Sequence, residues 1–182
     1  MKTITGQPQS GILVIDVQGN LARRVIDSVG VIQTISKTIR AARLLDIPVI
    51  VVEQLPEKLG PTVPELQQDI IGLPVFQKAS FDATMNSEIK SALTTSGITH
   101  WAVCGIEAHV CVWQTVKGLL DMGFNVDILT DGISSRTATN LTLATSRMKS
   151  SGATLSGFEM FMFEQLKDAT HPMFTSILPL FK

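Results

Sequence analysis

The sequence has little charge and little cysteine. Charged residues make up 17% of its 182 residues, below the roughly 25% of an average globular chain. Apolar residues (AVILMFWYC) reach 45%, and a chain this apolar and weakly charged is expected to fold rather than stay disordered. Two cysteines are too few for a disulfide scaffold. A surface short of charge also suggests that part of it is buried in an oligomer.

Other absences narrow the range of functions. With 15 basic and 16 acidic residues, the chain has no surplus of positive charge to release counterions from nucleic acid, so no nucleic-acid partner is expected. The longest apolar runs, such as Ile47–Val52, are far shorter than the ~20 residues of a membrane helix. The first ten residues are polar and carry no secretory signal pattern. These features predict a cytoplasmic protein without a membrane partner.

Short β-branched runs alternate with helical periods along the chain. The expected strands are Gly11–Val17, Pro48–Glu53, Val75–Lys78, His100–Gly105, Asn125–Thr130 and Thr154–Ser156. The expected helices are Val31–Asp46, Asn86–Thr95, a helix ending at Met122 before a C-terminal Gly123, and Asn140–Ser151. This alternation is typical of βαβ units. It predicts an α/β fold in one domain over residues 1–182, with a mainly parallel, six-stranded central sheet in a three-layer, Rossmann-like α/β/α arrangement.

Ligands of such sheets bind beyond the carboxyl ends of the strands. That rule selects Asp16 after the first strand, Lys78 at the end of the third, and Ile106–Cys111 after the fourth. Segment 54–74 has no clear period and contains four prolines. Its length suggests a lid or an interface arm.

Cys111 lies in the opening turn of a predicted helix. Helix N-terminal amides lower a thiol pKa, which makes Cys111 a candidate nucleophile; the alternative is an inert, buried cysteine. Cys104 lies inside an apolar strand and is expected to be inert. His109 is two residues before Cys111, so the two side chains do not face each other on a helix, and a cysteine–histidine dyad is disfavoured.

Asp16 and Lys78 also have two interpretations each. Asp16 is either a general base at a buried strand end or a cap or turn residue. Lys78 is either a charge that stabilises the thiolate or an ordinary solvated lysine. No three ligands occur at zinc-like spacing, and no glycine-rich phosphate motif is present, so neither a metal nor a cofactor is expected.

The C-terminal tail is rich in phenylalanine, over 158–163 and again over 174–181. The tail either packs on the surface of its own domain or makes a subunit contact. Together with the low charge content, it predicts a homo-oligomer, a dimer or a tetramer.

Four segments together resemble the isochorismatase-like cysteine hydrolases, the superfamily that includes nicotinamidases and N-carbamoylsarcosine amidohydrolases. They are LVIDVQ at 13–18, FQKASFDA at 76–83, GIEAHVCVWQTV at 105–116 and DGISSR at 131–136. The similarity extends over about residues 10–160, and GIEAHVCV looks closest to the small isochorismatase-domain proteins. The Asp-x-His metal motif of nicotinamidases is absent.

The resemblance implies the isochorismatase-like hydrolase fold and a catalytic triad of Asp16, Lys78 and Cys111. It also implies a cis peptide between Ile106 and Glu107, with the amides of Glu107 and Cys111 as an oxyanion hole. Further expected pocket residues are Gln18, Phe81, His109 and Trp113.

The expected activity is hydrolysis of a small amide or related C–N bond through an acyl-enzyme on the cysteine. Two alternatives stay open. One is isochorismatase-type cleavage of a vinyl ether, which requires basic residues for two carboxylates. The other is a non-catalytic, redox-responsive oligomer whose cysteine is an oxidisable thiol.

Overall fold

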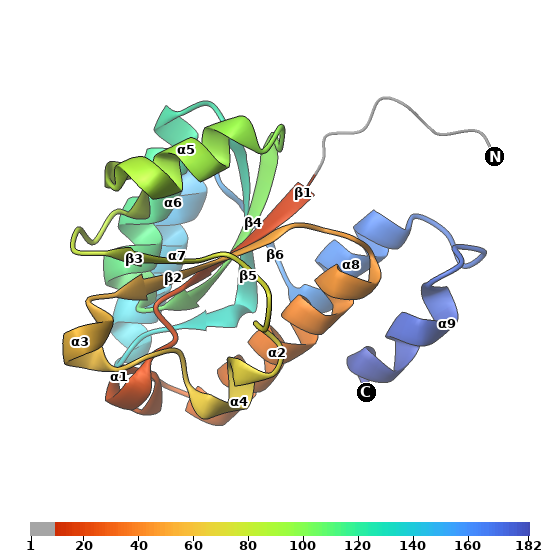
Figure 1. Ribbon diagram of the computed structural model, residues 1–182, viewed down its shortest axis with the longest axis horizontal. Coiled ribbons are helices and arrows are strands. Elements are labelled where there is room, and N and C mark those ends of the chain that lie inside the picture. Colours follow the sequence, from red (N-terminus) through yellow and green to blue (C-terminus); the bar gives the residue numbers. More distant parts are fainter. Residues whose placement is uncertain (1–9) are drawn as a thin grey trace.

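The apolar side chains of the strands are buried on both faces of the sheet. In β1 (Ser10–Ile15), Ile12 and Val14 belong to one hydrophobic cluster and Leu13 and Ile15 to another, and all four are fully buried. Successive side chains of a strand point to opposite faces, so each face needs its own cover of helices. The computed structural model, which describes residues 10–182, shows this arrangement (Figure 1).

Within residues 10–182 the sheet has six strands, all parallel, in the order β3-β2-β1-β4-β5-β6. The other five strands are β2 (Val49–Gln54), β3 (Val75–Lys78), β4 (His100–Ile106), β5 (Asn125–Ser134) and β6 (Thr154–Ser156). The chain passes from β3 to β4 across β1 and β2, so β1 and β4 are neighbours although they are far apart in sequence. This order reverses between β1 and β4, the type of position where parallel sheets bind ligands. The predicted α/β class and three-layer architecture are confirmed.

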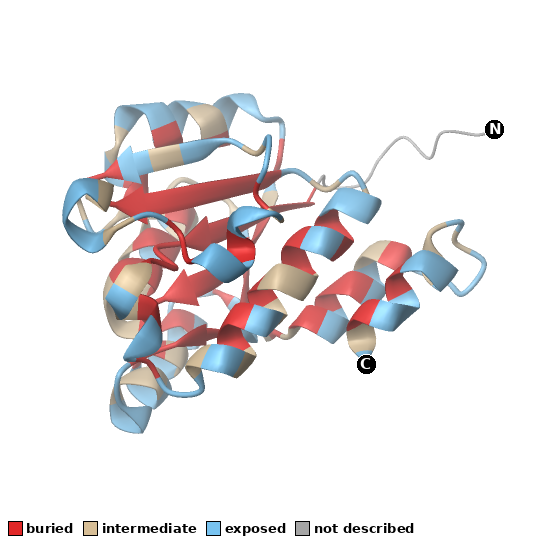
Figure 2. Ribbon diagram, turned by 60° about the horizontal axis from the view of Figure 1, so that its bottom comes forward, coloured by how far each residue is buried: buried red, intermediate tan, exposed pale blue. Residues whose placement is uncertain are grey.

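Two layers of helices cover the sheet. One face carries α2 (Ser28–Leu44) and α8 (Phe158–Leu166), and the other carries α5 (Ser87–Thr95), α6 (Trp113–Asp121) and α7 (Ala138–Ser150). Shorter helices are α1 (Gly19–Arg23), α3 (Pro56–Leu59), α4 (Pro64–Gln67), α9 (Phe174–Ile177) and the turns η1 (Ala83–Met85), η2 (Ala108–Val112) and η3 (Leu178–Phe181). In Figure 2 the inner strands are buried along most of their length, the edge strand β3 is largely exposed, and the long helices expose one side only.

Several predicted boundaries were wrong, and the differences lie near the strand ends. β1 stops at Ile15 because Asp16 takes a left-handed conformation, with φ of +53°, which breaks the extended strand. β5 runs on to Ser134, where it pairs with Ile106 of β4 after a register shift. Cys111 lies in the π-helical turn η2 rather than in a regular α-helix. The predicted C-terminal glycine of α6 is confirmed, since Gly123 has φ of +85°.

Segment 54–74 is tied to the strand ends. It contains α3 and α4, and it contacts the sheet through Thr62, whose amide and hydroxyl both donate to Glu53 Oε1 at 2.7 Å. The side chain of Gln18 also donates to the Gly60 carbonyl at 2.6 Å. These bonds fix the segment over the carboxyl ends of β1 and β2.

The phenylalanine-rich tail packs largely on its own chain. Phe161 is fully buried, and the rings of Phe163 and Phe181 stack with centroids 4.8 Å apart. Phe158 joins the same group, 5.3 Å from the Phe181 ring. Much of this apolar surface is therefore already covered within the chain, which weakens the tail as an argument for a subunit contact.

Candidate active site

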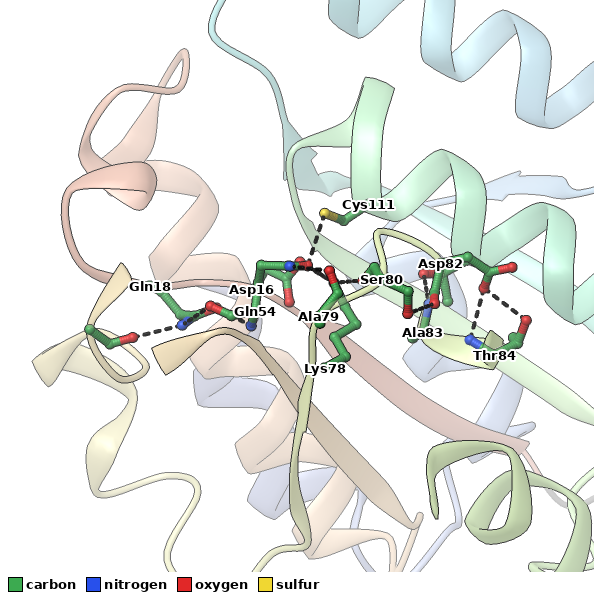
Figure 3. A network of polar contacts seen from close by, with 12 residues as sticks. Asp16, Gln18, Gln54, Lys78, Ala79, Ser80, Asp82, Ala83, Thr84 and Cys111 are labelled. Atoms are coloured by element: carbon green, nitrogen blue, oxygen red, sulfur yellow. Dashed lines mark hydrogen bonds and ion pairs between the residues drawn. The ribbon is translucent and has the colours of Figure 1, made fainter. Parts of the chain in front are cut away.

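Asp16 and Lys78 form a buried ion pair at the carboxyl ends of the strands. Asp16 directly follows β1 and Lys78 ends β3, with β2 between them. Lys78 Nζ lies 2.8 Å from Asp16 Oδ2, and both side chains are completely shielded from solvent. The ammonium also donates to Gln54 Oε1 at 2.6 Å and to the Ser80 carbonyl at 3.1 Å. All three donor positions of the lysine are thus occupied, as Figure 3 shows.

The environment of Asp16 makes it readier to hold a proton than an exposed carboxylate. Burial raises its pKa, and the neighbouring Lys78 charge opposes that rise. One carboxylate oxygen, Oδ2, accepts from Lys78, whereas Oδ1 is buried and has no hydrogen-bond partner among residues 10–182. An unpartnered buried carboxylate oxygen is costly to keep. It is available to accept a proton.

Cys111 lies beside this pair and is nearly buried. Its Sγ is 4.0 Å from Gln54 Oε1, the oxygen that also accepts from Lys78, and the residue is 6% exposed. Burial and the Asp16 charge raise the pKa of the Cys111 thiol to about 12, with Lys78 opposing them. The expectation of a thiol pKa lowered by the helix end was therefore wrong for the free protein. The resting group is a thiol that needs a base.

Gln54 is a central residue that sequence reasoning missed. Its Oε1 is the meeting point of Lys78 and Cys111, and its Nε2 donates to the Ala79 carbonyl at 2.7 Å. That second bond fixes the amide orientation, with the oxygen toward the lysine and the thiol. Gln54 lies at the end of β2, between the strands that carry Asp16 and Lys78, a position that becomes informative only when the strand order is known.

Gln18 holds the backbone around this group. Its Oε1 accepts from the backbone N–H of Gln54 at 2.6 Å. Its Nε2 donates to the backbone carbonyls of Gln54 at 3.2 Å and Gly60 at 2.6 Å. The side chain is fully buried. Gln18, expected as a pocket residue, lies within the network of Figure 3 and bridges it to segment 54–74.

Glu107 connects the end of β4 to the turn that carries Cys111. The peptide bond between Ile106 and Glu107 is cis. The Glu107 carboxylate accepts from Arg136 Nε at 2.9 Å, from Arg136 Nη2 at 2.5 Å and from the Arg136 amide at 3.1 Å. This charge-assisted pairing lowers the pKa of Glu107 and keeps it ionised. Its carbonyl accepts from the amides of Val110 and Val112, which flank the cysteine.

The other expected pocket residues make no hydrogen bond to the ion pair within residues 10–182. His109 Nδ1 lies 3.0 Å from Ser135 Oγ, and its Nε2 lies 3.2 Å from Asn140 Nδ2. The histidine thus ties η2 to the segment after β5 rather than to the thiol. Phe81 is 53% exposed in the loop after β3. The ring of Trp113 carries the Arg147 guanidinium 4.7 Å from its centroid.

The described residues also bear on whether the chain has a metal site or a membrane span. Among residues 10–182, no three histidine, cysteine or acidic side chains gather in a way that could hold a metal ion. None of the helices in that part of the chain is long and apolar enough to cross a membrane.

Fold and site together define a Rossmann-like α/β protein with a buried aspartate–lysine pair and a cysteine at the switch point of its sheet. The model of the Isochorismatase domain matches residues 10–160. The chain belongs to this family, whose members are generally hydrolases.

Two curated relatives illustrate the similarity. Isochorismatase domain-containing protein 2 of Danio rerio is 36% identical over 172 residues, covering 94% of this chain and 86% of the relative. The secreted isochorismatase effector Isc1 of Phytophthora sojae is 37% identical over 181 residues, covering 96% of this chain and 86% of its own.

Solved structures share the fold. A protein described as MAR1 ribonuclease from Caenorhabditis elegans is 34% identical, with a TM-score of 0.90 over 96% of this chain and 91% of that chain. YcaC from Escherichia coli, described as an octameric hydrolase of unknown specificity, is 21% identical, with a TM-score of 0.90 over 100% of this chain and 91% of that chain. At that identity YcaC shows the fold alone.

Proposed function

We propose that the protein is a cysteine hydrolase that cleaves a small amide or related C–N bond through an acyl-enzyme on Cys111. The observation that carries this proposal is one connected group of contacts: Lys78 Nζ donates to both Asp16 and Gln54, and Cys111 Sγ lies beside the same Gln54 oxygen. A thiol with a raised pKa, an unpartnered carboxylate oxygen and a fixed positive charge match the needs of nucleophilic catalysis by cysteine.

In the first half of the reaction, Asp16 Oδ1 takes the thiol proton as Sγ attacks the substrate carbonyl carbon. Lys78 stabilises the negative charge shared by Asp16 and Sγ while the proton moves between them. The amides of Glu107 and Cys111 donate to the developing oxyanion. Removing one such donor typically costs ~3–4 kcal/mol of transition-state stabilisation. The raised pKa of Asp16 suits a group that must first accept a proton and then release it.

In the second half, the tetrahedral intermediate collapses, the C–N bond breaks, and Asp16 returns its proton to the leaving nitrogen. Water then attacks the thioester carbon, with Asp16 taking a proton from it. The C–S bond breaks, the acid leaves, and the proton returns to Sγ. The net change is the addition of one water molecule across the C–N bond, with no oxidant, metal or cofactor required.

We propose a small-molecule substrate, one catalytic domain per chain and a homo-oligomeric assembly. Both cysteines are free thiols in the structure, and the attack needs Cys111 reduced, which fits a reducing, cytoplasmic compartment.

A panel of small amides tests the proposal. Wild type should release ammonia or amine from at least one member, and rapid quenching should trap an acyl adduct on the Cys111 peptide. Cys111→Ser should lose at least ~10³-fold in rate, whereas the matched control Cys104→Ser should retain activity. Isochorismate turnover that survives in Cys111→Ser would favour vinyl-ether cleavage instead. Reversible oxidation of Cys111 without turnover of any substrate would favour the redox-responsive alternative.

A further inference from the structure

A pocket of about 490 Å³ opens at the carboxyl edge of the sheet, beside the cysteine turn. Its walls come from α1 and the residue after it, from α3, and from the paired side chains of Glu107 and Arg136. The residues that matter for its chemistry are Arg24, Lys58, Leu59, Glu107 and Arg136.

The charged groups of this pocket are mostly positive. Arg24, Lys58 and Arg136 face it with one acid, Glu107, and that acid is already paired with Arg136. Arg24 and Lys58 form no ion pair with a described carboxylate in residues 10–182. The whole chain has a net charge of −1, so two uncompensated cations at one cavity stand out against the rest of the molecule. They favour an anion in that space.

Cys111 is not part of the pocket lining, but two lining residues are connected to it through hydrogen bonds and chain neighbours. Glu107 lines it, and the Glu107 carbonyl accepts from the amides on either side of Cys111. Another lining residue, Leu59, precedes Gly60, whose carbonyl accepts from Gln18. Gln18 in turn holds Gln54, the amide that contacts the thiol. Both chains of contacts run from the pocket lining to residues that surround Sγ.

We propose that the substrate is an anionic amide, with a carboxylate that Arg24 and Lys58 bind while its C–N bond lies at Cys111. This inference deepens the proposed function and rests on it. Arg136 supplies a third positive charge, but its guanidinium is engaged with Glu107. The two cations without partners therefore decide charge selection. Binding energy from a remote carboxylate would also help to place the reacting carbonyl.

Alkylation of Cys111 tests the charge selection without any substrate. Iodoacetate and iodoacetamide form the same bond from Sγ to the reagent CH₂ with loss of iodide, and they differ in charge. We expect the ratio of the iodoacetate rate to the iodoacetamide rate, normalised to free cysteine, to fall about fivefold in Arg24→Gln/Lys58→Gln. A change in the Cys111 pKa cancels in this ratio. Arg40→Gln/Lys149→Gln removes the same two charges from exposed positions and should leave it unchanged.

An equal ratio in wild type and pocket variant, or an equal fall in the control variant, would overturn the inference. So would cleavage of single-stranded RNA that depends on Arg24 and Lys58, because the cations would then serve a polyanion.

Turnover separates this inference from the proposed function. Succinamate, butyramide and β-alaninamide carry a carboxylate, a methyl and an ammonium on the same three-carbon amide. We expect kcat/KM to decrease from succinamate to butyramide to β-alaninamide. In Arg24→Gln/Lys58→Gln, the ratio of kcat/KM for succinamate to kcat/KM for butyramide should fall. Hydrolysis of all three amides at equal rates would overturn the charge selection but would still support the proposed hydrolase function. Charge-selective alkylation with no hydrolysis of any amide would instead support the charge selection and contradict the proposed hydrolase function.

Discussion

At the scale of single residues, the candidate site is a set of buried polar groups that satisfy one another. Lys78 has three acceptors, and the Gln54 amide is oriented by a separate bond to Ala79. Burying a charge is costly unless it is paired and hydrogen-bonded. The arrangement therefore leaves one group without a partner, Asp16 Oδ1, next to the thiol that the proposed reaction deprotonates.

The buried ion pair of Asp16 and Lys78 should contribute to the unfolding free energy. Lys78→Met removes the counter-ion of a fully buried carboxylate and should lower the unfolding free energy at pH 7 by about 3–5 kcal/mol. Without Lys78 the folded-state pKa of Asp16 lies further above its ordinary value of 3.8. The loss should therefore shrink as pH falls through that raised pKa and disappear below about 3.8, where Asp16 is protonated in both states. Urea unfolding at several pH values measures this. The exposed Lys90→Met is the control, and equal losses in the two variants would contradict the prediction.

The two cysteines should differ in reactivity. Cys111 is 6% exposed with a pKa of about 12, whereas Cys104 is fully buried and its pKa is raised further by burial. Iodoacetamide should label Cys111 well before Cys104, slowly at pH 7 and about tenfold faster per pH unit, because the thiolate fraction rises in that proportion below the pKa. Lys78→Met should slow the labelling. Peptide mass mapping after short exposure checks both statements; equal labelling of the two cysteines would refute the first.

Sequence reasoning could select the site residues only in part. Asp16, Lys78 and Cys111 follow from the rule that strand ends converge, together with the family resemblance. The role of Gln54 did not follow, because a glutamine at a strand end carries no signal of its own until the strand order is known. The direction of the Cys111 pKa also depended on burial and on the distance to Asp16. Those quantities are properties of the packed molecule.

At the scale of elements, the close approach of β1 and β4 requires glycine at one position. Gly105 has φ of +125°, and a Cβ added there would lie 2.1 Å from the Ile15 carbonyl oxygen. Gly105→Ala should lower the unfolding free energy by at least about 3 kcal/mol, because both the conformation and the contact are forbidden. Gly97→Ala, with φ of +74° and no atom within 4 Å of the added Cβ, should lose only about 1 kcal/mol. Thermal unfolding of the two variants compares them directly, and similar losses would contradict this account.

The opposite end of the sheet carries a pH-dependent contact. At the start of β4, His100 Nε2 lies 3.1 Å from Asp127 Oδ1 in β5, and this bond raises the pKa of His100 above 6.5. The contact should therefore contribute about 1 kcal/mol, fully present below about pH 6.5 and lost as pH rises through the raised folded-state pKa. Unfolding of wild type and His100→Gln between pH 6 and pH 9 measures the difference. Asp127→Asn should remove the same pH dependence; a constant difference between wild type and His100→Gln would rule the contact out.

The elements themselves were largely predictable. Buried strands such as His100–Ile106 stand out because β-branched and aromatic residues crowd into short runs. The strand ends were not predictable, since β1 stops where Asp16 turns left-handed and β5 extends through a register shift with β4. Segment 54–74 showed no period because its two helices have only four residues each. Tertiary hydrogen bonds and a few buried apolar side chains, Val63, Leu66 and Ile70, hold that segment.

At the scale of the whole molecule, the sheet separates two kinds of surface. The C-terminal tail packs against α2 in one helical layer. In the opposite layer, α7 buries only Ala144 and Met148. Its outer side presents an uncharged depression formed by Ala138, Thr139, Thr142, Leu143 and Ser146, with Leu143 56% exposed. Exposed apolar positions without charge are typical of surfaces that another chain covers.

We therefore expect a homo-oligomer in which α7 contributes to the contact between copies. Sedimentation equilibrium at micromolar concentration should show a dimer or a larger assembly rather than a 19.7 kDa species. Leu143→Arg should shift the distribution toward the monomer, because each copy would then bury an unpaired charge. Met85→Arg places the same charge at another exposed apolar position, 74% exposed in η1, and should leave the assembly intact. A wild-type monomer at every concentration would remove the expectation, and an unchanged assembly in Leu143→Arg would place the contact elsewhere.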